Sequence, residues 1–116
     1  MNHVKKSLLL LFTLAGLASC KESSIQIQNN ISQVSISDVY WGDFHLADQL
    51  YPGQSSDELI LQCAHHDFPF DEPIRFIMSS GNKSIYLETK AKYYLDCDDA
   101  LQIILTDDTE IINPNN

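Results

Sequence analysis

The amino-acid sequence predicts an all-β fold, a small antiparallel β-sandwich of about seven strands. From Ile31 onward, apolar and polar residues alternate in short runs, which is the side-chain period of a half-buried strand. Residues that favour turns, such as glycine, proline and aspartate, separate these runs at intervals of about 8–12 residues. We find no internal repeat of about 20–50 residues, so the runs are assigned to one domain.

The first segment of the chain has the three parts of a secretory signal peptide. Lys5 and Lys6 precede an apolar run over residues 8–16, and small residues follow before Cys20. The apolar run has about ten residues, whereas a membrane-spanning helix needs roughly 20. Residues 1–19 are therefore predicted to be a signal peptide that is removed from the mature protein.

The end of this segment, Leu17-Ala18-Ser19-Cys20, resembles the lipobox of bacterial lipoproteins. The resemblance implies cleavage before Cys20, a diacylglycerol on its sulfur and an acyl chain such as palmitate on its amine. Two or three chains anchor a protein almost permanently, because each buried methylene contributes about 0.8 kcal/mol. An ordinary secretory signal with a cysteine at the cleavage site by chance is the alternative. Lys21, in place of an aspartate, favours the outer membrane of the cell envelope, on its periplasmic or surface face.

Composition limits the partners of the remaining 97 residues. Two of the seven basic residues lie in the signal segment and none of the sixteen acidic residues does, so the mature chain has a net charge of −11. This charge argues against nucleic acid and against anionic lipid headgroups. It suits a cationic partner or divalent cations. We expect residues 20–30 to be the lipidated cysteine with a polar tether, and residues 31–116 to be the folded domain. A short first strand around Ile25 and Ile27 is the alternative for part of the tether.

Two cysteines remain once Cys20 is acylated. Cys63 and Cys97 form an even pair in an exported domain, which predicts a disulfide. Closing a loop of this size contributes about 3.8 kcal/mol in the chain-entropy model. The alternatives are two buried thiols or two thiolate ligands of a metal.

Alternating runs give the expected strands, and turn residues give their limits. The pair Pro52-Gly53 suits a type II turn, and Ser80-Gly81-Asn82 suits a tight hairpin. This pattern is that of an immunoglobulin-like or transthyretin-like sandwich. A short helix from residue 98 or 99 to residue 104 competes with one strand, and residues 66–73 are expected to be a long loop. Strands are expected at residues 34–37, 58–63, 74–78, 85–88, 93–95, 101–106 and 111–112.

Two groups of residues could hold a metal ion. Cys63 and His65 would share one face of a strand, and thiolate and imidazole suit zinc. Carboxylates suit calcium, although the acidic clusters lack the glycine-containing spacing of an EF-hand and lie about 23 Å apart if a strand separates them. Each group has an alternative explanation. Cys63 can be a disulfide cysteine followed by a solvated loop, and the aspartates can be ordinary turn residues. The candidate ligands are Asp96, Asp98, Asp99, Asp107, Asp108, His65 and His66.

Aromatic residues are the candidates for binding a partner. Phe68 and Phe70 flank Pro69 in the expected loop, and loops commonly carry function. Trp41 is a further candidate, with the filling of one end of the core as its alternative role. Motifs of hydrolases, phosphate loops and metalloproteases are missing from the sequence, so we expect no enzyme. The sequence thus favours a non-catalytic envelope module that binds a protein or glycan, with a calcium- or zinc-binding domain as the alternative.

The anchor prediction is tested by replacing the lipidated residue. Cys20→Ala removes the sulfur that carries the diacylglycerol, so we expect the protein to leave the membrane fraction. Intact-mass analysis of the wild type should show the acyl mass, and that of the variant should not. A variant that stays in the membrane fraction, together with a wild type of unmodified mass, would refute the anchor.

Overall fold

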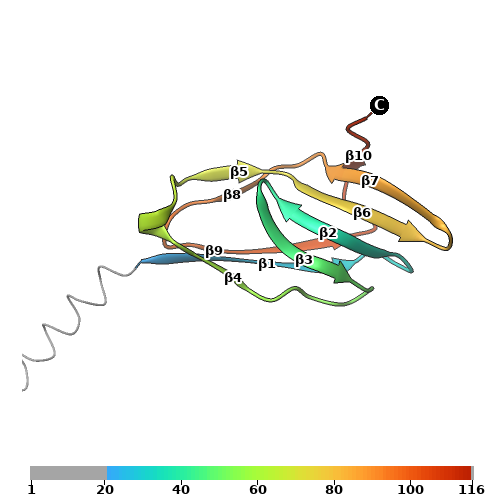
Figure 1. Ribbon diagram of the computed structural model, residues 1–116, viewed down its shortest axis with the longest axis horizontal. Helices are drawn as coiled ribbons and strands as arrows, with labels where there is room; N and C mark the ends of the chain where they lie inside the picture. The colour runs from blue at the N-terminus through green and yellow to red at the C-terminus, as the bar shows by residue number, and fades with distance from the viewer. Residues whose placement is uncertain (1–20, 116) are drawn as a thin grey trace, which may run out of the picture.

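The computed structural model describes residues 21–115; the predicted signal peptide and Cys20 lie outside this range. The all-β prediction is confirmed, with ten strands in place of about seven (Figure 1). A short 3-10 helix, η1 (Cys63–His65), is also present. The strands are β1 (Glu22–Asn30), β2 (Ser35–Trp41), β3 (Phe44–Leu50), β4 (Leu59–Gln62), β5 (Phe70–Glu72), β6 (Ile74–Ser80), β7 (Lys83–Thr89), β8 (Tyr93–Leu95), β9 (Ala100–Thr106) and β10 (Ile111–Ile112).

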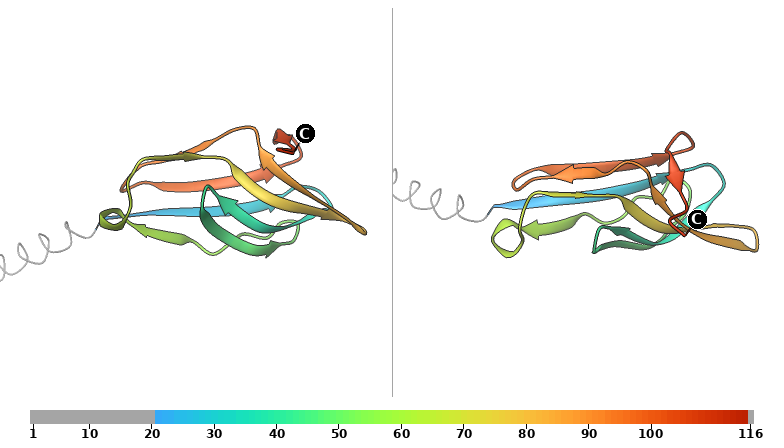
Figure 2. Two further views of the ribbon diagram at one scale, coloured as in Figure 1. Left: turned by 45° about the horizontal axis from the view of Figure 1, so that its top comes forward. Right: turned by 90° about the horizontal axis from the view of Figure 1, so that it is seen from above.

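The strands form a sandwich of two layers (Figure 2). One layer is a three-stranded sheet in the order β4-β1-β9. The other is a five-stranded antiparallel sheet in the order β10-β7-β6-β2-β3. β5 leads into β6 and β7 leads into β8, so the short β5-β8 ribbon extends the β6-β7 pair along the length of the domain (Figure 1). One pairing departs from the antiparallel prediction, because β1 and β9 run parallel from Ser24 opposite Ala100 to Asn30 opposite Thr106.

The segment predicted as a tether is instead the central strand of the three-stranded sheet. β1 begins at Glu22 and pairs with β4 on one side and β9 on the other. Ile25 and Ile27 are fully buried, whereas Gln26 and Gln28 face outward. The tether prediction was wrong, because the polar residues of this segment were taken as signs of a solvated linker, and the alternative of a first strand is found at a length of nine residues. The folded domain therefore starts two residues after Cys20.

A buried carboxamide joins the two layers. The Asn29 side chain on β1 donates hydrogen bonds to the carbonyl groups of Val34 and Leu50, both at 3.0 Å. Its oxygen accepts the Ile31 N–H at 3.1 Å. Asn29 has no exposed surface, so each of these bonds replaces water that cannot reach the groups. The end of β1 is thereby fixed to the start of β2 and the end of β3.

Between the layers lies one apolar core, to which both sheets contribute. Trp41 and Phe76 are the largest fully buried side chains. Within residues 21–115 every buried side-chain nitrogen and oxygen has a hydrogen-bond partner. The buried apolar residues are Ile25, Ile27, Ile31, Ile36, Val39, Trp41, Leu46, Leu50, Leu61, Ile74, Phe76, Leu95, Ile103 and Leu105.

Besides β1, two further strands were not predicted, and one alternative is corrected. β3 was missed because Leu46 is an extra residue opposite the Val39/Tyr40 step, and this bulge interrupts the alternation. β5 has only three residues and lies inside the expected loop over residues 66–73. Residues 100–106 form strand β9, so the competing helix is wrong.

The predicted turns occur where proline and glycine indicated them. The Gln54 N–H donates to the Tyr51 carbonyl at 2.9 Å, and Gly53 between them has φ of 85°. Gly81, with φ of 63°, lies in the hairpin between β6 and β7. Glycine occupies these positive φ values without the steric cost that a β-carbon would add.

The burial of β1 predicts a large difference between neighbouring substitutions. Ile27→Ala removes a fully buried side chain and should lower the free energy of unfolding by about 2–5 kcal/mol in urea titrations. Gln28→Ala changes the exposed face of the same strand and should shift it by no more than about 0.5 kcal/mol. Equal small effects would return residues 21–30 to the role of a tether.

Candidate functional site

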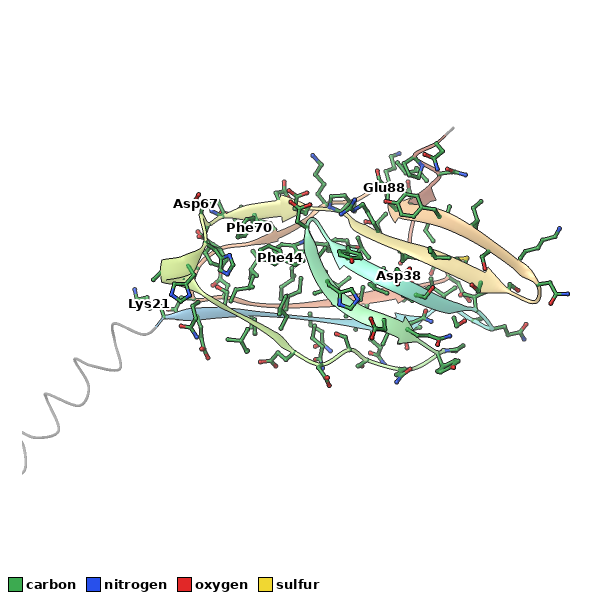
Figure 3. The ribbon with its side chains drawn as sticks, in the orientation of Figure 1. Lys21, Asp38, Phe44, Asp67, Phe70 and Glu88 are labelled. Carbon is green, nitrogen blue, oxygen red and sulfur yellow. A yellow bond between two sulfur atoms is a disulfide. The ribbon has the colours of Figure 1, made fainter. Side chains whose placement is uncertain are left out.

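The disulfide lies at the end of the sandwich where the described chain begins. Cys63 in η1 and Cys97 after β8 are bonded, which confirms the predicted pair over free thiols or metal ligands. The Cys63 N–H donates to the Lys21 carbonyl at 3.1 Å. The first described residue is thus held directly against the disulfide loop, and Figure 3 shows Lys21 at this end.

Aromatic side chains pack between the disulfide end of the sandwich and the apolar core. The Phe44 and Phe70 rings, labelled in Figure 3, lie 5.2 Å apart between centroids and meet edge to face. The Phe68 and Phe70 rings also meet edge to face, at 5.1 Å. The His66 ring lies against Phe44 at 5.5 Å. Edge-to-face packing of this kind is favourable beyond the area that it buries. We call Trp41, Phe44, His66, Phe68 and Phe70 the aromatic cluster.

Trp41 fills one end of the core, which is the alternative role given for it above, and is therefore not accessible to a partner. It has no exposed surface, and its indole N–H donates to the Tyr93 carbonyl at 3.1 Å, which fixes β8 against β2. Phe68 and Phe70 are half-buried and pack against the core.

The candidate metal ligands do not come together. Within residues 21–115 no three His, Cys, Asp or Glu side chains are placed to hold one ion. β9 separates Asp98 and Asp99 from Asp107 and Asp108. Asp96 accepts a hydrogen bond from the Cys97 N–H at 2.7 Å. His65 is exposed, whereas His66 packs in the aromatic cluster.

Asp107 has a structural contact that explains its position. Its two carboxylate oxygens accept the Ser32 N–H and the Ser32 hydroxyl, both at 2.7 Å. The backbone hydrogen bond, then the hydroxyl, lowers the pKa of Asp107 below its ordinary value of 3.8, because both favour the charged carboxylate. This carboxylate therefore connects the β9–β10 turn to the β1–β2 turn.

An open pocket of about 420 Å³ lies where β7 leads into β8. Lys90 and Glu110 form an ion pair in its wall at 3.4 Å, and Tyr93 provides its aromatic side. Burial raises the pKa of Tyr93, so its phenol stays protonated over a wider pH range. The remaining lining residues are Ala91 and Thr109, so the pocket contains neither a thiol nor an imidazole for nucleophilic or base chemistry.

The outer face of the five-stranded sheet carries a broad set of tyrosines. One row across the strands contains Tyr86, Ile77, Ser37 and Gln49, and the next contains Glu88, Arg75, Tyr40 and His45. The Tyr51 hydroxyl lies 3.4 Å from the Gln49 side-chain oxygen, which places this ring beside the first row. We call Tyr40, Tyr51, Tyr86, Ile77, Arg75 and His45 the tyrosine face.

Arg75 is held in place on this face. Its guanidinium lies 5.7 Å from the centre of the Tyr40 ring and donates to the Gly42 carbonyl. The His45 ring packs edge-on against Tyr40 at 5.1 Å. Tyr51 and Tyr86 remain accessible, at 58% and 37% of their surface. The face thus combines fixed cationic and aromatic groups with rings that solvent reaches.

Sequence reasoning did not identify the tyrosine face. Its residues come from four strands and the turn after β3, so no local motif contains them. A usable signal was the presence of tyrosines at outward positions of predicted strands, such as Tyr86 between Ile85 and Leu87. Comparison of the chain with family models, curated proteins and solved structures finds no match. Among residues 21–115 there is no helix long and apolar enough to cross a membrane.

The role of Phe70 can be tested by stability. Phe70→Ala should lower the free energy of unfolding by about 2 kcal/mol, less than the roughly 3–5 kcal/mol of a fully buried phenylalanine. Tyr94→Ala, on the strand paired with β5, removes a ring that is 57% exposed and serves as the control. Equal melting temperatures for the two variants would return Phe70 to the list of binding residues.

Proposed function

We propose that the chain is a lipid-anchored, non-catalytic domain of the cell envelope that binds a partner protein through the tyrosine face. Two observations support the lipid anchor: residues 17–20 resemble a lipobox, and Cys20 lies two positions before the first residue of β1. A position so close to the folded domain holds the sandwich near the membrane surface. The membrane is thus the first partner, reached through Cys20.

The observation that carries the binding role is the composition of the tyrosine face. Tyrosine and arginine are the residues most enriched at the energetic centres of protein interfaces, whereas acidic residues are depleted there. This chain has sixteen acidic residues, yet Glu88 is the one carboxylate in the two rows of the face. Two further carboxylates lie at the border of the face, Asp48 at 3.1 Å from His45 and Asp43 at 4.0 Å from Arg75, so part of its charge is already paired within the domain.

The shape of the face also suits a protein partner. Four hydrogen-bonded strands span about 15 Å at roughly 4.8 Å between neighbours, which gives a wide platform. Fixed rings such as Tyr40 lose little conformational entropy on binding. The aromatic cluster, by comparison, offers half-buried rings that already pack on one another.

The test uses a photo-crosslinking amino acid in place of Tyr86. In envelopes of the native host, this position should give a discrete protein adduct, and the double variant Tyr40→Ala and Tyr51→Ala should remove the adduct. Ile60 on β4, which is 41% exposed on the outer face of the other sheet, is the control position for the crosslinker. The melting temperatures must match, so that loss of the adduct reports binding.

Two results would overturn the proposal. Equal adducts from Tyr86 and Ile60 would mean that the tyrosine face has no preferred partner. A heterogeneous adduct that glycosidases remove would mean that the face binds a glycan in place of a protein.

A further inference from the structure

β9 is an edge strand with an open side. It is the last strand in the order β4-β1-β9 and, among the described strands, it pairs with β1 alone. Its seven residues make it as long as the central strands of the other layer (Figures 1 and 2). An edge of this length is a template on which a further strand can pair.

The pairing pattern identifies the backbone groups on the open side. The Ser24 N–H donates to the Asp99 carbonyl at 3.1 Å, so the odd-numbered residues of this segment direct their backbone groups toward β1. Thr106 directs its groups the other way, because its N–H and carbonyl bond to Thr109 in the following turn. The alternation leaves the N–H and carbonyl groups of Ala100, Gln102 and Ile104 along the open edge.

The open edge lacks the features by which proteins prevent strand addition. Residues 100–106 contain no charge and no proline, and the β1-β9 register runs without a bulge. Ile104 is 47% exposed on the outer face of this strand. Lysine, proline and bulges are the usual means of protecting such an edge, and here none is used.

Acidic residues at both ends decide what can pair with β9. Asp98 and Asp99 precede the strand, and Asp107 and Asp108 follow it. A second copy of this chain would bring these carboxylates beside their own counterparts in either strand direction, and like charges at that distance repel. An extended segment with lysine or arginine at both ends would meet opposite charges instead.

We propose that β9 binds an extended peptide strand with basic ends by β-strand addition. The main-chain groups of Ala100, Gln102 and Ile104 supply the hydrogen bonds. The selectivity for basic ends comes from Asp98, Asp99 and Asp108, because the Asp107 carboxylate is already bonded to Ser32. This site is on the other layer from the tyrosine face and does not depend on it.

The test measures binding of two synthetic peptides to the full chain in non-ionic detergent. The probe is Lys-Lys-Thr-Val-Thr-Val-Thr-Val-Thr-Lys-Lys, and its match has glutamate in place of every lysine. We expect the lysine peptide to bind about tenfold more tightly at low salt, with the difference falling as salt screens the aspartates. Amide hydrogen exchange at Ala100, Gln102 and Ile104 should slow when the lysine peptide is added.

Two variants separate the edge from the charges. Gln102→Pro removes an outward N–H and should abolish binding, whereas Gln62→Pro makes the matching change on β4, the other edge strand of this sheet, and should not. Asp98→Asn with Asp108→Asn should remove most of the preference for lysine ends. Asparagine tolerates the positive φ of 71° at position 98, so the loop keeps its conformation.

Three outcomes would overturn the proposal. Equal affinity for the two peptides would contradict charge selection. Unchanged exchange at the three edge amides would contradict strand addition, and this measurement stands even if Gln102→Pro fails to fold. If hydrogen exchange at these amides slows as the protein concentration rises, without peptide, the edge binds a second copy of the chain instead.

Discussion

The two-sided pairing of β1 is the constraint on which the fold depends. Its odd-numbered residues bond on the side of β4 and the 53–56 segment, and its even-numbered residues bond to β9. This arrangement satisfies a backbone that would otherwise be buried without partners, and it places Ile25 and Ile27 in the centre of the core. Because β9 runs parallel to β1, the chain must cross between the layers before it returns, and the β5-β8 ribbon and the disulfide lie on that path.

Both ends of β1 are fixed by polar groups, and these groups set the positions of the candidate surfaces. At one end the Ser23 hydroxyl donates to the Asp96 carbonyl at 2.7 Å, next to the Cys63–Cys97 bond. At the other end Asn29 holds β2 and β3, which together with the turn after β3 carry half of the tyrosine face. β1 therefore supports the tyrosine face through the hydrogen bonds of Asn29 to the opposite layer, and it supports the open edge of β9 through direct pairing with that strand. Such polar contacts are specific in a way that apolar burial alone is not.

Strand alternation predicted most of the fold, and it did so where one face of a strand is apolar and the other polar. Alternation predicted β9 from Leu101, Ile103 and Leu105, whereas the disulfide was predicted separately from the even number of remaining cysteines. It was misapplied at β1, where Ile25 and Ile27 alternate with Gln26 and Gln28 and the polar composition was given more weight. The tyrosine face could not be predicted in the same way, because it depends on the order and register of four strands, which are set by contacts distant in sequence.

The start of β1 at Glu22 has a mechanical consequence. A force applied at Lys21 enters the fold along a strand that is bonded on both sides, and Figure 1 shows the β6-β7 hairpin at the opposite end of the domain. Tension between these ends would load the β1-β4 and β1-β9 hydrogen bonds together in shear, whereas a strand peeled from an edge breaks its bonds one at a time. The domain is therefore built to transmit a pulling load along its length without first unravelling.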